Sequence, residues 1–100
     1  MIESFDIIKT TELIKTDKGK SIQLLGFWVE LDGTWTNSYY FSFRYGNEPK
    51  DYFKKSTSGV AAINLTDMGK DATLPPNVSL NGYISGGNAH VHITLIYKIV

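Results

Sequence analysis

The chain has 100 residues, which is enough for one domain with a single modest core, so we expect residues 1–100 to form one domain. Ten acidic and ten basic side chains cancel, and Arg44 is the only arginine, so we predict that the chain does not bind nucleic acid. The absence of cysteine excludes disulfides and thiolate chemistry, and leaves good packing or oligomerisation to stabilise a domain of this size.

The first fifteen residues predict two strands or one bent strand, with a short helix as the alternative, because their apolar residues fit neither period cleanly. The N-terminal segment Met1-Ile2-Glu3-Ser4-Phe5-Asp6 is acidic and its apolar run is soon interrupted, which is unlike a signal peptide. Every apolar run is too short to span a bilayer. We therefore expect synthesis in a cytoplasm and no membrane insertion.

The aromatic residues concentrate in one segment, since ten of the thirteen lie between Phe27 and Phe53. Asp32-Gly33 favours a type I′ turn there, so we predict one long hairpin over residues 22–43 in which Leu31 faces Thr34. One face of that hairpin is expected to be core, with the pairs Glu30 and Trp35, Trp28 and Asn37, Gly26 and Tyr39, Leu24 and Phe41, and Ile22 and Phe43. The other face is also rich in apolar residues, namely Leu25, Phe27, Val29, Leu31 and Tyr40.

Three interpretations fit this second apolar face. A second sheet or the N-terminal strands cover it within the same chain, or it is a subunit interface of a homo-oligomer. In the third interpretation it binds a sugar, with Trp28, Trp35 or Tyr40 stacking on the apolar side of the ring.

The next segments carry turns and short strands. Tyr52-Phe53-Lys54-Lys55 predicts an edge strand protected by its lysines. Residues 67–77 predict a loop, because Pro75 and Pro76 cannot donate the hydrogen bonds of a ladder. Together, the spacing of strands and turns predicts an all-β fold, an antiparallel β-sandwich or Greek-key barrel of about seven or eight strands.

The C-terminal segment, residues 89–100, alternates strongly between two faces and places His90 and His92 on the same one. Two imidazoles at this spacing could hold a divalent ion, but no third ligand is identifiable, so we predict no metal site. The alternative is a pair of surface or interface histidines whose protonation could loosen a subunit contact.

No motif for catalysis is present, because the chain has no G-x-S-x-G elbow, HExxH sequence, P-loop or cysteine nucleophile. Glu30 and Asp32 bracket the predicted turn and are better explained by its solubility than by acid–base chemistry. We therefore predict no enzymatic activity and no cofactor.

The last quarter of the chain, Leu80-Asn81-Gly82-Tyr83-Ile84-Ser85 followed by Gly86-Gly87-Asn88 and the strand ending at Val100, resembles the C-terminal hairpin of small trimeric heads on bacteriophage fibres and receptor-binding proteins. The resemblance implies a β-sandwich or Greek-key barrel, assembly as a trimer, and a virion role in host attachment or capsid decoration. With no coiled-coil or collagen-like stalk before the domain, a stand-alone decoration or accessory protein suits the chain better than a fibre tip.

The leading hypothesis is therefore a non-enzymatic virion structural, accessory or attachment domain that acts through homo-oligomer assembly, with a trimer favoured. Other virion proteins or a cell-surface glycan are the further expected partners, and a carbohydrate-binding, lectin-like module is the alternative function. The residues expected at a binding site or interface are Phe27, Trp28, Val29, Trp35, Tyr40, His90 and His92.

Overall fold

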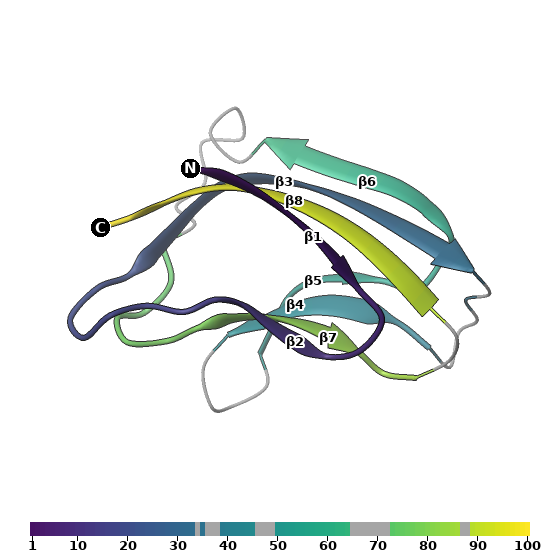
Figure 1. The fold of residues 1–100 in the computed structure, drawn as a ribbon, viewed down its shortest axis with the longest axis horizontal. Coiled ribbons are helices and arrows are strands. Elements are labelled where there is room, and N and C mark those ends of the chain that lie inside the picture. Colours follow the sequence, from purple (N-terminus) through teal and green to yellow (C-terminus); the bar gives the residue numbers. More distant parts are fainter. Residues whose placement is uncertain (34, 36–38, 46–49, 65–72, 87–88) are drawn as a thin grey trace.

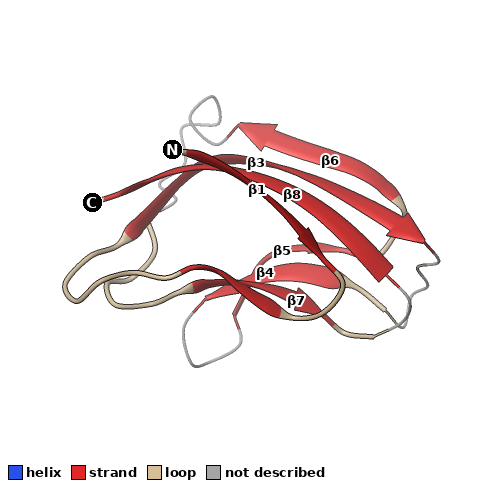
Figure 2. Cartoon of the chain, viewed as in Figure 1, coloured by secondary structure: helices blue, strands red, loops and turns tan. Residues whose placement is uncertain are grey.

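The computed structural model describes residues 1–33, 35, 39–45, 50–64, 73–86 and 89–100, which form strands and connecting turns without any helix (Figures 1 and 2). Consequently no helix that could cross a membrane is found among these residues. The strands in chain order are β1 (Ile2–Ile7), β2 (Thr11–Ile14), β3 (Ile22–Gly33), β4 (Phe41–Tyr45), β5 (Lys50–Lys55), β6 (Gly59–Asn64), β7 (Leu80–Ile84) and β8 (Ala89–Ile99).

The strands form two four-stranded antiparallel sheets, with the orders β1-β8-β3-β6 and β2-β7-β4-β5, packed face to face (Figure 1). Four nested pairs generate this order, because β1 pairs with β8, β2 with β7, β3 with β6 and β4 with β5. The chain therefore follows the path of one long hairpin that is rolled around a core, which is the arrangement of an eight-stranded jelly roll. The predicted antiparallel β-sandwich is confirmed.

The long hairpin predicted over residues 22–43 is wrong, and the C-terminal hairpin implied by the resemblance is also not formed. β3 lies between β8 and β6, so both of its edges are occupied, and the chain after Gly33 continues into β4 of the opposite sheet. In the same way β7 pairs with β2 and β4, whereas β8 pairs with β1 and β3, so β7 and β8 are not paired with each other. Neighbouring strands of the sequence therefore lie mostly in opposite layers, and only β4 and β5 pair directly.

A β-bulge at Leu25 explains why β3 is apolar on both faces. The register with β8 runs Leu24↔Tyr97 and then Gly26↔Ile96, so Leu25 is one extra residue. An extra residue reverses the alternation, because successive side chains of a strand point to opposite faces. Leu24 is buried before the bulge, and Phe27, Val29 and Leu31 are buried after it. Trp28, predicted to be core, faces outwards instead.

Two further sequence predictions, for residues 1–15 and for the edge strand β5, are confirmed. Residues 1–15 contain two strands, β1 and β2, rather than a helix, and β5 is an edge strand as its lysines predict. Residues 67–72 of the predicted loop lie outside the described residues. Beyond them Thr73 forms an isolated bridge with Gln23, and Leu74 is buried with its amide donating to the Ile22 carbonyl at 2.9 Å.

The core fills the space between the two sheets. At its centre, Phe43 lies 5.0–5.9 Å, between ring centroids, from three other phenylalanines, namely Phe27, Phe41 and Phe53. The buried apolar residues are Ile7, Leu13, Ile14, Ile22, Leu24, Phe27, Val29, Leu31, Phe41, Phe43, Leu74, Leu80, Val91, Ile93, Leu95 and Tyr97. Phe27, Val29 and Leu31, which belong to the second apolar face predicted for residues 22–43, are thus covered within the same chain. This is the first of the three interpretations.

Candidate functional site

The outer face of the β1-β8-β3-β6 sheet combines a polar cluster with exposed apolar side chains. Its strands are in register, so residues of neighbouring strands form rows across the sheet. One row contains Ser4, Thr94, Trp28 and Ala62, and the next contains Asp6, His92, Glu30 and Val60. We call this surface the outer face of the first sheet.

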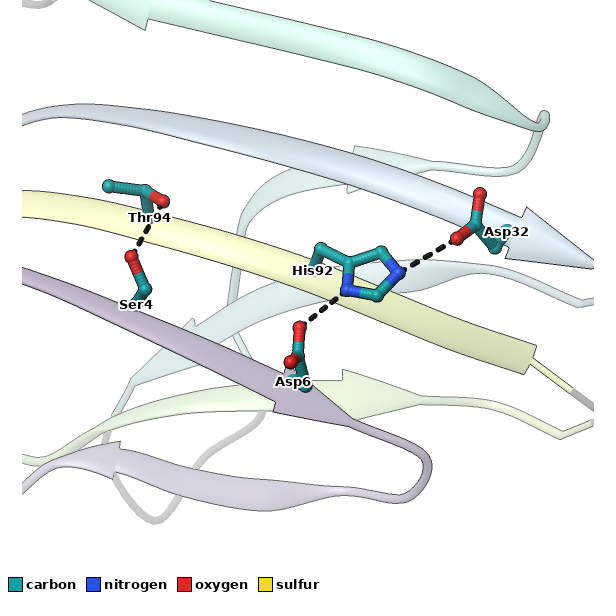
Figure 3. A network of polar contacts seen from close by, with 5 residues as sticks. All are labelled: Ser4, Asp6, Asp32, His92 and Thr94. Atoms are coloured by element: carbon teal, nitrogen blue, oxygen red, sulfur yellow. Dashed lines mark hydrogen bonds and ion pairs between the residues drawn. The ribbon is translucent and has the colours of Figure 1, made fainter.

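His92 lies at the centre of the polar cluster and contacts a carboxylate on each side (Figure 3). Its Nδ1 contacts an Asp6 carboxylate oxygen on β1, and its Nε2 lies 2.7 Å from Asp32 Oδ2 near the end of β3. One row away, the Ser4 and Thr94 hydroxyl oxygens lie 3.0 Å apart. A single imidazole on β8 therefore joins three strands of the sheet at the surface.

These contacts raise the pKa of His92. A carboxylate can only accept a hydrogen bond, so both ring nitrogens of His92 donate only when the imidazole is doubly protonated. The hydrogen bond with Asp6 is the largest cause that raises the pKa of His92 above its ordinary 6.5, and the bond with Asp32 adds to it. Two carboxylates therefore favour the protonated form of His92, and Glu30 lies opposite His92 in the register.

His90 and His92 share the outer face, as the alternation predicts, and their ring centroids lie 6.3 Å apart. Asp6 and Asp32 lie at opposite nitrogens of the His92 ring, so they do not converge with it on one point. Across the described part of the chain, no group of three or more His, Asp and Glu side chains has the geometry to hold a metal ion. The side-chain contacts of the cluster connect β8 with β1 and with β3.

Large apolar side chains lie beside this cluster on the same face. Trp28 is 36% exposed and Ile96 42%, and Val60 at the β6 edge is 54% exposed. Ile96 and Trp28 lie in neighbouring rows of β8 and β3, and Val60 lies one row from the partner of Trp28. Contiguous exposed apolar side chains with a polar border are typical of surfaces that contact another protein.

The structure separates the residues that the sequence grouped as one binding site. Phe27 and Val29 are core residues, 4% and 0% exposed, and offer no surface to a partner. Trp35 is half-buried, packs against the core, and donates from its indole nitrogen to the Asp32 carbonyl at 2.9 Å. Trp28 lies on the first sheet, whereas Tyr40 lies beside the second, so the two rings do not form one platform.

A second cluster, which sequence reasoning missed, covers the outer face of the β2-β7-β4-β5 sheet. The Tyr40 and Tyr83 rings lie 5.7 Å apart, Arg44 stacks 3.6 Å from the Tyr83 centroid, and Lys54 Nζ lies 4.0 Å from that of Tyr40. Arg44 also donates to the Tyr40 hydroxyl at 2.9 Å. Ser42 lies opposite both Tyr83 and Lys54 in the register and is fully buried. Only the alternation of Tyr40, Ser42 and Arg44 could have indicated this cluster.

Comparisons with known proteins show similarity at the level of the fold. No protein-family model matches the chain, and no curated protein is significantly similar to it. Among solved structures, the fold resembles that of a chain in the acid-stable capsid structure of Helicobacter pylori bacteriophage KHP30. The similarity covers 100% of this chain and 97% of that one, with a TM-score of 0.54 and 12% sequence identity. The two chains therefore share a fold over nearly their whole lengths.

Proposed function

We propose that this chain is a non-enzymatic structural protein of a bacteriophage virion, which acts by assembling with copies of itself and with other capsid proteins. The observation that carries the proposal is the whole-length similarity of fold to a chain of a phage capsid. Jelly rolls occur in both viral capsid and lectin domains, so the fold by itself does not select between these functions. The similar capsid chain favours the first.

The outer face of the first sheet supports the same proposal. Exposed Trp28, Ile96 and Val60 provide apolar area, and the His92 cluster beside them provides a polar border. A protein contact surface has this composition, with an aromatic and aliphatic centre and a polar rim. For the self-assembly we expect a trimer, the state implied by the resemblance of the last quarter of the chain to phage head domains.

The test is whether the chain is part of virions from its source. We expect mass spectrometry of gradient-purified, salt-washed virions to detect it in many copies, and gold-labelled antibodies against it to decorate the capsid. Absence from washed virions would overturn the proposal. Label confined to the tail tip would replace capsid assembly by host attachment.

A pair of variants tests which face makes the contact. Ile96→Asp places a charge on the outer face of the first sheet, whereas Asn81→Asp places the same charge on the outer side of the second. We expect only Ile96→Asp to reduce incorporation into virions, because a buried carboxylate without a partner is costly. Equal incorporation of both variants would assign the contact to another surface.

A further inference from the structure

The four strands at the sheet edges differ in how they are protected against pairing with another chain. β5, with the sequence KDYFKK, carries three lysines, and β1, IESFDI, carries two acidic residues. β2 has only four residues and an irregular register between Glu12 and Ile14. Charges, short length and bulges are the devices by which proteins prevent their edge strands from pairing. Three of the four edges therefore carry such a device.

β6 is the exception. Its six residues, GVAAIN, contain no charge and no proline, and its register with β3 is regular over all six. β3 occupies one edge of β6, and along residues 59–63 no described strand pairs with the other edge. In Figure 1 β6 forms the outer border of its sheet. A backbone edge of this kind presents a row of amides and carbonyls whose natural partner is another extended strand.

We propose that β6 pairs with β6 of a second copy of this chain, antiparallel about a two-fold axis, so that two four-stranded sheets become one continuous sheet. A two-fold contact brings the same strand to itself, so the strand must tolerate its own side chains as neighbours. Uncharged β6 meets this condition. If β5 paired with itself in this way, lysines would lie near lysines, and if β1 did so, carboxylates would lie near carboxylates. Like charges across a strand pair are destabilising.

The side chains of β6 also favour a second copy as the partner. Val60, which is 54% exposed, and Ala62, which is also exposed, point to the outer face of the first sheet. In the two-fold pair they lie beside Val60 and Ala62 of the other copy, and the exposed Trp28 of each chain continues the apolar surface one strand further in. The pairing thus adds apolar contact to the backbone hydrogen bonds. Because a two-fold contact uses the same strand of both chains, it joins two copies and does not extend into a fibre.

The test compares two double variants that add the same charge at opposite edges of the same sheet. Val60→Lys/Ala62→Lys places lysines on β6 and imitates the protection of β5. Ile2→Lys/Ser4→Lys is the matched control, because Ile2 and Ser4 are likewise exposed and two residues apart on β1. The mass of each purified, untagged protein is measured by light scattering and sedimentation over a range of concentrations. Circular dichroism confirms that each variant is folded.

We expect the β6 variant to have half the mass of the wild type, and the β1 variant to have the wild-type mass. Breaking a two-fold contact halves the particle whether the rest of the assembly is a monomer or a trimer. The dissociation constant of the contact, obtained from the concentration dependence of the mass, should be at least about tenfold higher in the β6 variant than in the wild type. Equal masses of wild type and β6 variant, an equal loss in the β1 variant, or a wild type that grows without limit would each overturn the proposal.

Hydrogen exchange of the wild type gives a second measurement that needs no variant. Amides on the outer edge of β6 should exchange more slowly at high than at low protein concentration, while those of β1 should not change. Exchange of residues 59–63 that is independent of concentration would also overturn the proposal. Both measurements use the purified chain, so their outcome does not depend on whether the protein is found in virions.

Discussion

The most direct test of the bulge at Leu25 compares Phe27→Ala with Trp28→Ala. Simple alternation from Ile22 places Trp28 in the core and Phe27 at the surface, whereas the structure reverses the two positions. Phe27 is 4% exposed and its ring lies 5.1 Å from Phe43 and 4.8 Å from Phe53, between centroids. Trp28 is 36% exposed on the outer face. The two truncations should therefore have very different costs.

Removing the Phe27 ring leaves a cavity among aromatic neighbours, which costs about 3–5 kcal/mol of unfolding free energy. Truncating the outward-facing Trp28 should cost about 1 kcal/mol or less in dilute solution. In a domain of this size each kcal/mol corresponds to a fall of about 4–8 °C in Tm, so Phe27→Ala should lower Tm by at least about 12 °C. Trp28→Ala should lower it by no more than about 8 °C.

The assay is thermal and urea unfolding followed by far-ultraviolet circular dichroism, which does not depend on the fluorescence of the tryptophan being removed. If Phe27→Ala does not fold, Phe27→Leu replaces it, and its cost should still exceed that of Trp28→Ala. Equal costs, or a larger cost for Trp28→Ala, would refute the reversed alternation after Leu25. That result would restore the regular strand expected from the sequence.

Three further predictions follow from local geometry. Deleting Leu25 should leave a folded protein, because it removes the extra residue and keeps the later register, whereas deleting Val29 should prevent folding by turning Leu31 outwards; thermal melts of both deletions decide. Gly26→Ala should lower stability by about 1–3 kcal/mol in urea titrations, since its Cβ would lie 2.9 Å from the Ile63 carbonyl oxygen; an unchanged midpoint would contradict this. The raised pKa of His92 sets the sign of the pH dependence expected for His92→Gln. The unfolding free energy of the wild type should exceed that of the variant fully below about pH 6.5, and this difference should disappear as the pH rises through the folded-state pKa of His92. Because these contacts are partly exposed, each should contribute at most about 1 kcal/mol, and urea titrations that show a constant difference across pH would contradict the assignment.

The sequence by itself determined the strands and the class of fold. Alternation with a period of two, broken at glycine, proline and Asp-Gly turns, is a local signal, so the lysine-bearing edge strand β5 and the common face of His90 and His92 could be predicted. Residues 1–15 lack clean alternation, so the sequence left two strands, one bent strand and a short helix open there. The strand β8 contains no irregularity in its pairing with β1, and for that reason its two faces could be assigned directly.

Only the tertiary structure decided which strands pair and which side chains meet. Pairing in a jelly roll joins distant segments, as Ile2 and Ile96 show, and the bulge at Leu25 is visible only against the partner strand. The two carboxylates that contact His92 lie 86 and 60 residues away in the chain, at Asp6 and Asp32. Local sequence patterns report the conformation of each segment, whereas burial between two sheets depends on the path of the whole chain, and that path determined the core, the polar cluster and the unprotected edge of β6.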